Sequence, residues 1–195
     1  MRFLSVFTIT LLLASAAEAH TGADAAAGLS HGFLHPLGGL DHILAMVGVG
    51  LLGFVIGGRA IWQVPVAFVA MMALGGALGI AGTGLPLVET GIALSVVAIG
   101  AAVVFGAKLP LAAAITLASG FSVFHGYAHG AEMPLAASGL AYGLGFMAAT
   151  ALLHAVGVGS GFALRQFSGK TGGRAARLVG GLLSLSGLGL LSGVL

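Results

Sequence analysis

The chain has 195 residues, of which 58% are hydrophobic and only 6% are charged. A soluble domain carries roughly 25% charged residues, so this composition indicates an integral membrane protein. The sequence contains no cysteine, which excludes disulfides, thiolate metal ligands and cysteine nucleophiles. The seven Lys and Arg residues do not gather on a soluble face, so nucleic acid is excluded as a partner.

The N-terminus has the pattern of a secretory signal peptide. Arg2 supplies a positive charge, residues 3–14 form an apolar segment, and Ala17-Glu18-Ala19 is a small-x-small cleavage site. Cleavage there predicts a signal peptide over residues 1–19 and a mature chain that begins at His20. The alternative is a retained first transmembrane helix, but an apolar run of about 12–14 residues is short for that purpose.

The mature chain contains six apolar segments, each near the roughly 20 residues that cross the hydrocarbon core of a bilayer. They predict an all-α membrane protein with one domain over residues 20–195, a compact bundle of six transmembrane helices with short connections. Glycine pairs four residues apart, such as Gly75/Gly79 and Gly139/Gly143, predict close helix packing. The predicted spans are 33–57, 61–82, 86–106, 109–129, 136–163 and 178–195.

The basic residues predict the orientation of the bundle. Cytoplasmic loops of membrane proteins are enriched in Lys and Arg. If the mature N-terminus is periplasmic, every Lys and Arg of the mature chain falls in a cytoplasmic loop, and both mature termini are periplasmic. Asp24, Glu89 and Glu132 then lie on the periplasmic side. A signal peptide requires the same location for the N-terminus.

A first group of polar residues lies at the start of the first predicted span. An Asp at the centre of a membrane helix costs about 2.5–3.5 kcal/mol on insertion scales, so polar groups here are expected to be functional. His35 and His42 share one face if the helix is regular, but Pro36 and Gly38-Gly39 predict a loose or broken turn between them. Asp41 is expected either to bind a metal or to orient an imidazole that does.

A second group closes the fourth predicted span. His125 and His129 are four residues apart and Glu132 follows three residues later, so all three share a helical face if the helix persists. Two imidazoles and a carboxylate on adjacent turns can chelate one divalent cation. No Glu directly follows His125, so the His-Glu-x-x-His motif of metalloproteases is absent. The first span begins and the fourth ends outside, so both groups are predicted at the same membrane level.

Imidazole and carboxylate ligands suit Ni, Co, Zn, Cu(II) and Fe, and affinity alone does not separate these metals. Other residues are candidates for collecting or relaying the ion. His154 lies in the inner half of the fifth span, as a relay or as a histidine bonded to a backbone carbonyl, and Glu89 is either a vestibule residue or a solvated loop-end carboxylate. The candidates for uptake or relay are His20, His31, Met46, Glu89 and His154.

The segment from His35 to Met46, His-Pro-Leu-Gly-Gly-Leu-Asp-His-Ile-Leu-Ala-Met, resembles the signature of the HupE/UreJ family of nickel/cobalt permeases, which accompany hydrogenases and ureases. The segment from Phe124 to Glu132 is similar to that family's second motif. The resemblance covers the whole chain and implies uptake of Ni²⁺ or Co²⁺ across the bacterial inner membrane without a prosthetic group. It also implies metallochaperones of hydrogenase or urease maturation as cytoplasmic partners. By this resemblance the metal-binding residues are His35, Asp41 and His42, followed by His125, His129 and Glu132.

Two other functions remain open. An intramembrane zinc hydrolase could use three histidines and an aspartate to activate water, but it needs a closed ligand set, a cleft open to lipid and a general base. A permease instead needs weaker ligands along a path, and a membrane potential of 100 mV favours inward movement of a divalent ion by about 4.6 kcal/mol, so ATP is unnecessary. The second alternative to a permease is a metal sensor or structural protein that carries no ion across the membrane.

Overall fold

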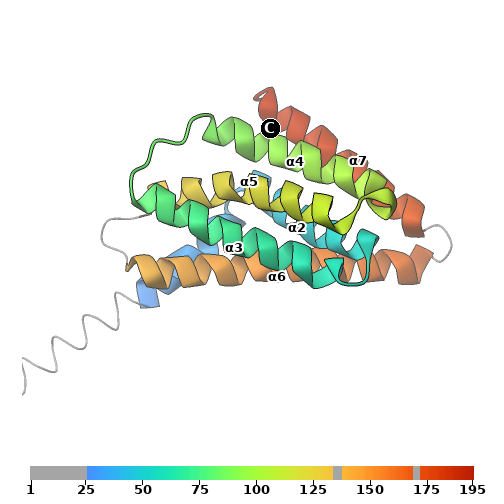
Figure 1. Cartoon of the computed structure of the whole chain (residues 1–195), viewed down its shortest axis with the longest axis horizontal. Helices are drawn as coiled ribbons and strands as arrows, with labels where there is room; N and C mark the ends of the chain where they lie inside the picture. Colours follow the sequence, from blue (N-terminus) through green and yellow to red (C-terminus); the bar gives the residue numbers. More distant parts are fainter. Residues whose placement is uncertain (1–25, 134–137, 169–171) are drawn as a thin grey trace, which may run out of the picture.

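The computed structural model describes residues 26–133, 138–168 and 172–195, and all regular structure within these ranges is helical. The predicted signal peptide and His20 lie outside the described residues. A helix here termed the leading helix (Ala26–Leu37) ends in the 3-10 turn η1 (His35–Leu37), and a second 3-10 turn, η2 (Gly106–Lys108), joins α4 to α5. The labelled helices in Figure 1 are α2 (Leu40–Ile56), α3 (Ala60–Ile80), α4 (Val88–Phe105), α5 (Leu111–Ala131), α6 (Gly139–Ser168) and α7 (Gly172–Leu191).

Among the described residues, five helices are long and apolar enough to cross a membrane, or six spans if the leading helix and α2 form one bent span. The protein is therefore an all-helical, multi-pass membrane protein. Each predicted boundary of the second, third and fourth spans lies within about two residues of α3, α4 and α5, the uncertainty usual for helix ends.

The helices of the last two predicted spans extend beyond the predicted bounds at the basic end of the bundle. α6 continues past residue 163 to Ser168, and α7 begins at Gly172 rather than at residue 178. Arg165, Arg174 and Arg177 are exposed at the end of the bundle. A helix can continue there because its charged side chains do not have to be buried. α7 ends at Leu191, two residues before Gly193, which has a φ of 70° that does not continue a helix.

The first predicted span consists of two helices rather than one. The leading helix and α2 are bent by 82° at the break between them. Pro36 occupies the first turn of η1, and Gly39 is extended with φ −102° and ψ 122°. A proline in a helix interior removes a backbone hydrogen bond, and glycine destabilises a helix because it loses more conformational freedom on folding. Pro36 and the Gly38-Gly39 pair together therefore favour a break in this segment. As a result His35 and His42 belong to different helices.

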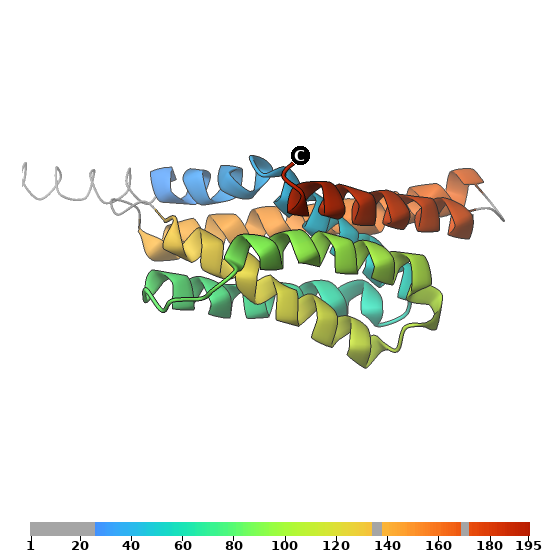
Figure 2. The same cartoon turned by 90° about the horizontal axis from the view of Figure 1, so that it is seen from above.

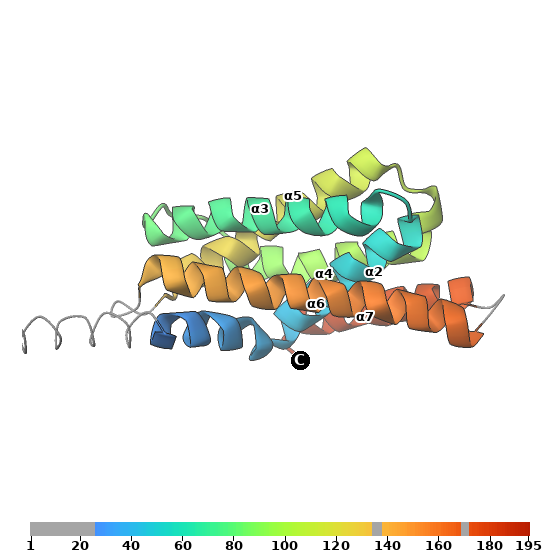
Figure 3. The same ribbon diagram turned by 90° about the horizontal axis from the view of Figure 1, so that it is seen from below.

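Helix α2 is the centre of the bundle. It contacts α3, α4, α5, α6 and α7, and nine of its 17 residues are buried. Around it, α3 packs along α5 and α4 packs along α7, as Figures 1 and 2 show. The leading helix lies beside the first part of α6 (Figure 3), where Gly32 and Gly145 allow the two backbones to approach closely. Polar side chains at the start of α2 are therefore enclosed by protein rather than by lipid.

Glycine allows α5, which carries His125 and His129, to pack tightly on α3. A Cβ atom on Gly126 would overlap the carbonyl oxygen of Met72, and a Cβ on Gly130 would overlap that of Gly76. The predicted pair Gly75/Gly79 lies at the same interface. The pair Gly139/Gly143 does not serve this purpose, because a Cβ on Gly143 would meet no described atom within 4 Å.

The two ends of the bundle differ in charge. At the end where α2, α4 and α6 finish, the described basic residues are Arg59, Lys108, Arg165, Arg174 and Arg177. Glu89 in the first turn of α4 and Glu132 after α5 belong to the opposite end (Figure 1). This separation follows the pattern on which the orientation prediction rests, and the basic end is the one expected to face the cytoplasm.

Candidate metal site

A cavity of about 680 Å³ opens at the acidic end of the bundle, between the leading helix, α2, α4, α5 and α6. The described residues of its lining include no Lys or Arg, so the fixed charge of its carboxylates favours cations. His31 and Glu89, which the sequence indicated as uptake residues, both line it. The polar residues of the lining are His31, His35, Asp41, His42, Glu89, His129, Glu132 and Tyr142.

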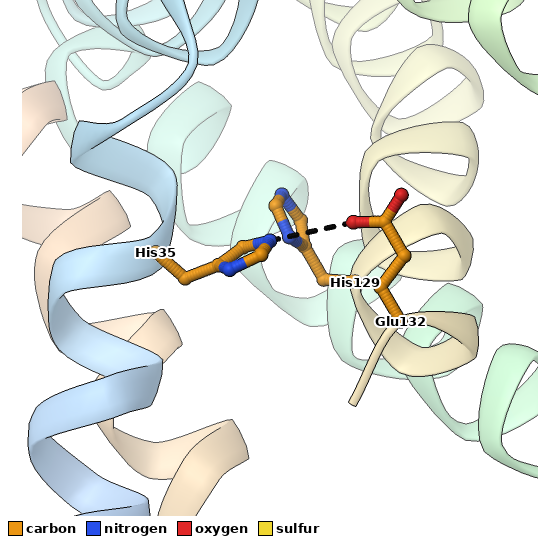
Figure 4. A group of neighbouring side chains, drawn as sticks. All are labelled: His35, His129 and Glu132. Carbon is orange, nitrogen blue, oxygen red and sulfur yellow. Dashed lines mark ion pairs between the residues drawn. The ribbon is translucent and has the colours of Figure 1, made fainter. Parts of the chain in front are cut away.

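Three of these side chains form a group at the mouth of the cavity, the mouth triad of His35, His129 and Glu132 (Figure 4). One ligand atom from each lies within 4.8 Å of the others, and His35 Nε2 is 3.4 Å from Glu132 Oε2. Glu132 directly follows the last residue of α5, so it stays near the helical face of His129, as the sequence predicts. The side chains of His35 and Glu132 are 38% and 60% exposed, so an ion can reach them from water.

Deeper in the cavity, Asp41 holds the ring of His42. Asp41 Oδ1 accepts a hydrogen bond from His42 Nδ1 at 2.9 Å and another from the His42 backbone N–H at 2.8 Å. A carboxylate only accepts hydrogen bonds, so Nδ1 carries the proton and Nε2 is the bare nitrogen of the neutral ring. Nε2 is buried and has no hydrogen-bond partner among the described residues. Of the two roles expected for Asp41, the geometry fits the orienting one.

Gly39 provides the space for this arrangement. A Cβ atom at Gly39 would lie 2.6 Å from Asp41 Oδ1 and 3.1 Å from His42 Nδ1. The break between the leading helix and α2 therefore has two effects. It changes the direction of the chain, and it places a residue without a side chain against the Asp41–His42 pair.

The next ring inward belongs to His125 on α5, which is fully buried. Its Nε2 lies 2.8 Å from Ser95 Oγ on α4, and its Nδ1 has no partner among the described residues. His129, one turn further along α5, has no partner on either ring nitrogen within the same part of the chain.

The two predicted groups meet as a continuous row of imidazoles, here termed the histidine ladder. The ring centroids of His35 and His129 are 4.7 Å apart, those of His129 and His42 are 4.3 Å apart, and those of His42 and His125 are 4.7 Å apart. With Asp41 and Glu132 beside its members, the ladder runs from the exposed mouth to the buried interior of the bundle.

His154 lies beyond the ladder on α6. The ring of Phe68 on α3 lies near both histidines, with centroid distances of 5.7 Å to His125 and 5.2 Å to His154. His154 is only 2% exposed, and neither ring nitrogen has a partner among the described residues, so the backbone hydrogen bond considered for it is not formed there. Met46 is fully buried in the apolar core and does not line the cavity.

Comparison with known proteins identifies the family. A family model described as "HupE / UreJ protein" matches residues 8–190. The chain belongs to the HupE/UreJ family. This HupE/UreJ protein is also 47% identical over 183 residues to Protein HupE from Rhizobium leguminosarum bv. viciae, an alignment that covers 94% of each chain. No solved structure matches it. The family resemblance predicted from the two histidine motifs is confirmed.

Four residues of the site in this HupE/UreJ protein were not predicted from the sequence: Ser95, Tyr142, Phe68 and Gly39 as a space-provider. Ser95 carried one available signal, because it is a hydroxyl in the interior of a span whose other polar residues, Glu89 and Thr90, lie in its first turn. Phe68 carried none, since a phenylalanine in a membrane helix is ordinary. Tyr142 lies 6.0 Å from the His35 ring between centroids.

Proposed function

We propose that this protein is a secondary permease that takes up Ni²⁺ or Co²⁺ across the bacterial inner membrane for nickel or cobalt enzymes, with Zn²⁺ as a competing substrate. The observation that carries the proposal is the histidine ladder, which leads from an open acidic cavity into the buried centre of the bundle. Imidazole is a ligand that suits all three ions, and the family resemblance is the reason to favour Ni²⁺ and Co²⁺. The ion is the substrate and no prosthetic group is required.

The first step is capture at the mouth. The carboxylates of Glu89, Glu132 and Asp41 concentrate cations in a cavity whose described lining residues include no Lys or Arg. The mouth triad then replaces part of the water shell, because its imidazoles and carboxylate already lie close enough to share one ion. Because the side chains of His35 and Glu132 are exposed to water, this exchange of ligands is reversible.

The second step is transfer along the ladder. His129 belongs to the mouth triad and its ring also lies 4.3 Å from that of His42, so it can contact the ion at both positions. His42 and His125 then offer buried nitrogens that have no other partner among the described residues. His154 would follow, because the ring of Phe68 lies near both His125 and His154, at centroid distances of 5.7 Å and 5.2 Å. The membrane potential favours the inward direction, by about 2.3 kcal/mol per charge per 100 mV.

The rival hydrolase is less well supported by the arrangement. A hydrolase that cuts a membrane substrate needs its ligands and a general base on a cleft that lipid-embedded chains can reach. A groove of about 730 Å³ between α3 and α6 is lined by apolar residues and His154, and no carboxylate is among its lining residues. The carboxylates lie instead around the mouth cavity. We therefore assign transport and no enzymatic reaction, with cytoplasmic metallochaperones as the expected receivers of the ion.

The test is uptake into liposomes that contain the purified full chain and have a negative interior potential. Wild type is expected to accumulate Ni²⁺ or Co²⁺, His42→Ala is expected to lose this uptake, and His31→Ala, a cavity histidine outside the ladder, is expected to retain most of it. Unchanged uptake by His42→Ala would reject this site. Binding without flux in wild type would favour a sensor, and zinc-dependent hydrolysis of a membrane peptide without flux would favour the hydrolase.

A further inference from the structure

We propose that Ser95 is a positioning residue of the permease: its hydroxyl oxygen accepts the Nε2–H of His125 and so makes Nδ1 the nitrogen that binds the ion. The inference rests on the proposed function for the identity of the ion. The hydrogen-bond geometry itself does not depend on it.

The serine has one hydroxyl hydrogen, and its neighbours decide where that hydrogen goes. Ser95 Oγ lies 2.6 Å from the carbonyl oxygen of Ile92 and 2.8 Å from His125 Nε2. A carbonyl carries no hydrogen, so two oxygens 2.6 Å apart require the serine hydrogen between them. Ser95 therefore donates to Ile92 and can only accept from His125. It follows that Nε2 of His125 is protonated and that Nδ1 of the neutral ring is bare.

The bare Nδ1 is fully buried and has no hydrogen-bond partner among the described residues. The same is true of Nε2 of His42, whose ring lies edge to face with that of His125 at a centroid distance of 4.7 Å. A buried acceptor is unfavourable without a donor or a cation, and His42 and His125 each present one here. A cation that accepts both lone pairs would remove that cost.

The two rings are held by partners of different charge. His42 is held by a carboxylate and His125 by a neutral hydroxyl, and a carboxylate raises the basicity of a ligating imidazole more than a hydroxyl does. Ser95 therefore fixes the orientation of the His125 ring without adding a second buried negative charge. That combination suits a substrate ion, which has to leave the site after it binds.

The test compares Ser95→Ala with Ser122→Ala. Ser122 is an equally buried serine, three residues before His125 on α5, whose hydroxyl donates to the carbonyl oxygen of Ser119 at 2.8 Å. Both changes remove one buried hydroxyl, but among the described residues only the hydroxyl of Ser95 is hydrogen-bonded to the His125 ring. Ser95→Thr keeps a hydroxyl at the position and serves as the rescue variant.

The first readout is ¹⁵N NMR of the histidine-labelled full chain without metal, with the His125 signals assigned from a His125→Gln sample. Wild type, Ser122→Ala and Ser95→Thr are expected to show a protonated Nε2 and a bare Nδ1 in His125. Ser95→Ala is expected to show a mixture of tautomers. A bare Nε2 in wild type, or the wild-type pattern in Ser95→Ala, would overturn the assignment.

The second readout is equilibrium binding of Ni²⁺ to the same samples. Loss of a partner that orients a metal-binding histidine typically costs 10–100-fold in affinity, so Ser95→Ala is expected to weaken binding by about that factor while Ser122→Ala does not. Equal losses in the two alanine variants would overturn the proposal. Wild type could also neither bind nor transport metal and still show the expected NMR pattern. In that case the permease function is rejected, but the hydrogen bond between Ser95 and His125 is retained.

Discussion

His42 and His125 differ from His129 and His154 in how their rings are held. Asp41 bonds one nitrogen of His42 and Ser95 bonds one nitrogen of His125, whereas neither nitrogen of His129 or His154 has a partner among the described residues. All four histidines are buried, so solvent does not explain the difference.

The difference indicates two kinds of ligand within one row. A ring that is fixed by a hydrogen bond presents one nitrogen in one direction, which favours binding. A ring that is confined only by packing, as His129 is against Phe146 at a centroid distance of 4.0 Å, can turn to follow an ion. We therefore expect His42 and His125 to determine affinity, and His129 and His154 to determine the rate of transfer.

The largest change in metal affinity is expected from a substitution that displaces the hydrogen-bonded ring of His42 without removing it. In Gly39→Ala the new Cβ would lie 2.6 Å from Asp41 Oδ1, so the carboxylate must move away from His42. Metal affinity is expected to fall by about 10–100-fold, as for the loss of an orienting partner. The measurement is Ni²⁺ binding to the purified chain by calorimetry.

Gly38→Ala is the matched control for that change. A Cβ at Gly38 would meet the His35 carbonyl oxygen at 3.4 Å, an ordinary contact, so binding is expected to stay near the wild-type value. If both alanines weaken binding equally, the bend itself and not the Asp41–His42 pair is the sensitive feature. If neither does, the held ring does not set the affinity.

A smaller effect, and one of a different kind, is expected from His154→Ala. Among the described residues the ring of His154 contacts Phe68 rather than a histidine of the ladder, so loss of the His154 side chain should leave Ni²⁺ binding unchanged. If His154 receives the ion on the cytoplasmic side of Phe68, the uptake rate should fall by about tenfold, which corresponds to about 1.4 kcal/mol in the barrier. Parallel binding and liposome uptake assays separate the two quantities, and a loss of binding equal to the loss of uptake would place His154 in the binding site instead.

The sequence predicted which residues meet, but not how they are held. Hydropathy and the alternation of short loops placed the start of the first span and the end of the fourth at one level, and His35, His42, His125 and His129 do lie together. Depth along a helix is visible in a sequence, whereas rotation about the helix axis is not. Ser95 could not be assigned to His125 for that reason, because nothing in an apolar span indicates which face meets α5.

Proline and glycine positions in the sequence predicted some features of the backbone but not others. Pro36 and Gly38-Gly39 predicted a disturbed turn, but the 82° bend depends on the packing of the leading helix on α6, which no local pattern contains. Glycine spacing likewise identified Gly75/Gly79 but missed Gly126 and Gly130 on the opposing helix, since many glycine pairs in this chain have the same spacing and only the folded bundle selects among them.

The smallest expected effect concerns the charge of the cavity rather than its ligands. Glu89 lines the cavity from the first turn of α4 and is not part of the mouth triad, whereas Glu132 lies 3.4 Å from His35 Nε2. Glu89→Gln should lower uptake at limiting Ni²⁺ by only about two- to threefold at low ionic strength. Because the Debye length falls from about 30 Å at 0.01 M to about 8 Å at 0.15 M, that difference should shrink as salt is added.

Glu132→Gln should lower uptake further and keep most of its effect in salt, because it removes a ligand as well as a charge. Equal salt dependence in the two variants would mean that Glu132 acts only through its charge, and the mouth triad would then not bind the ion.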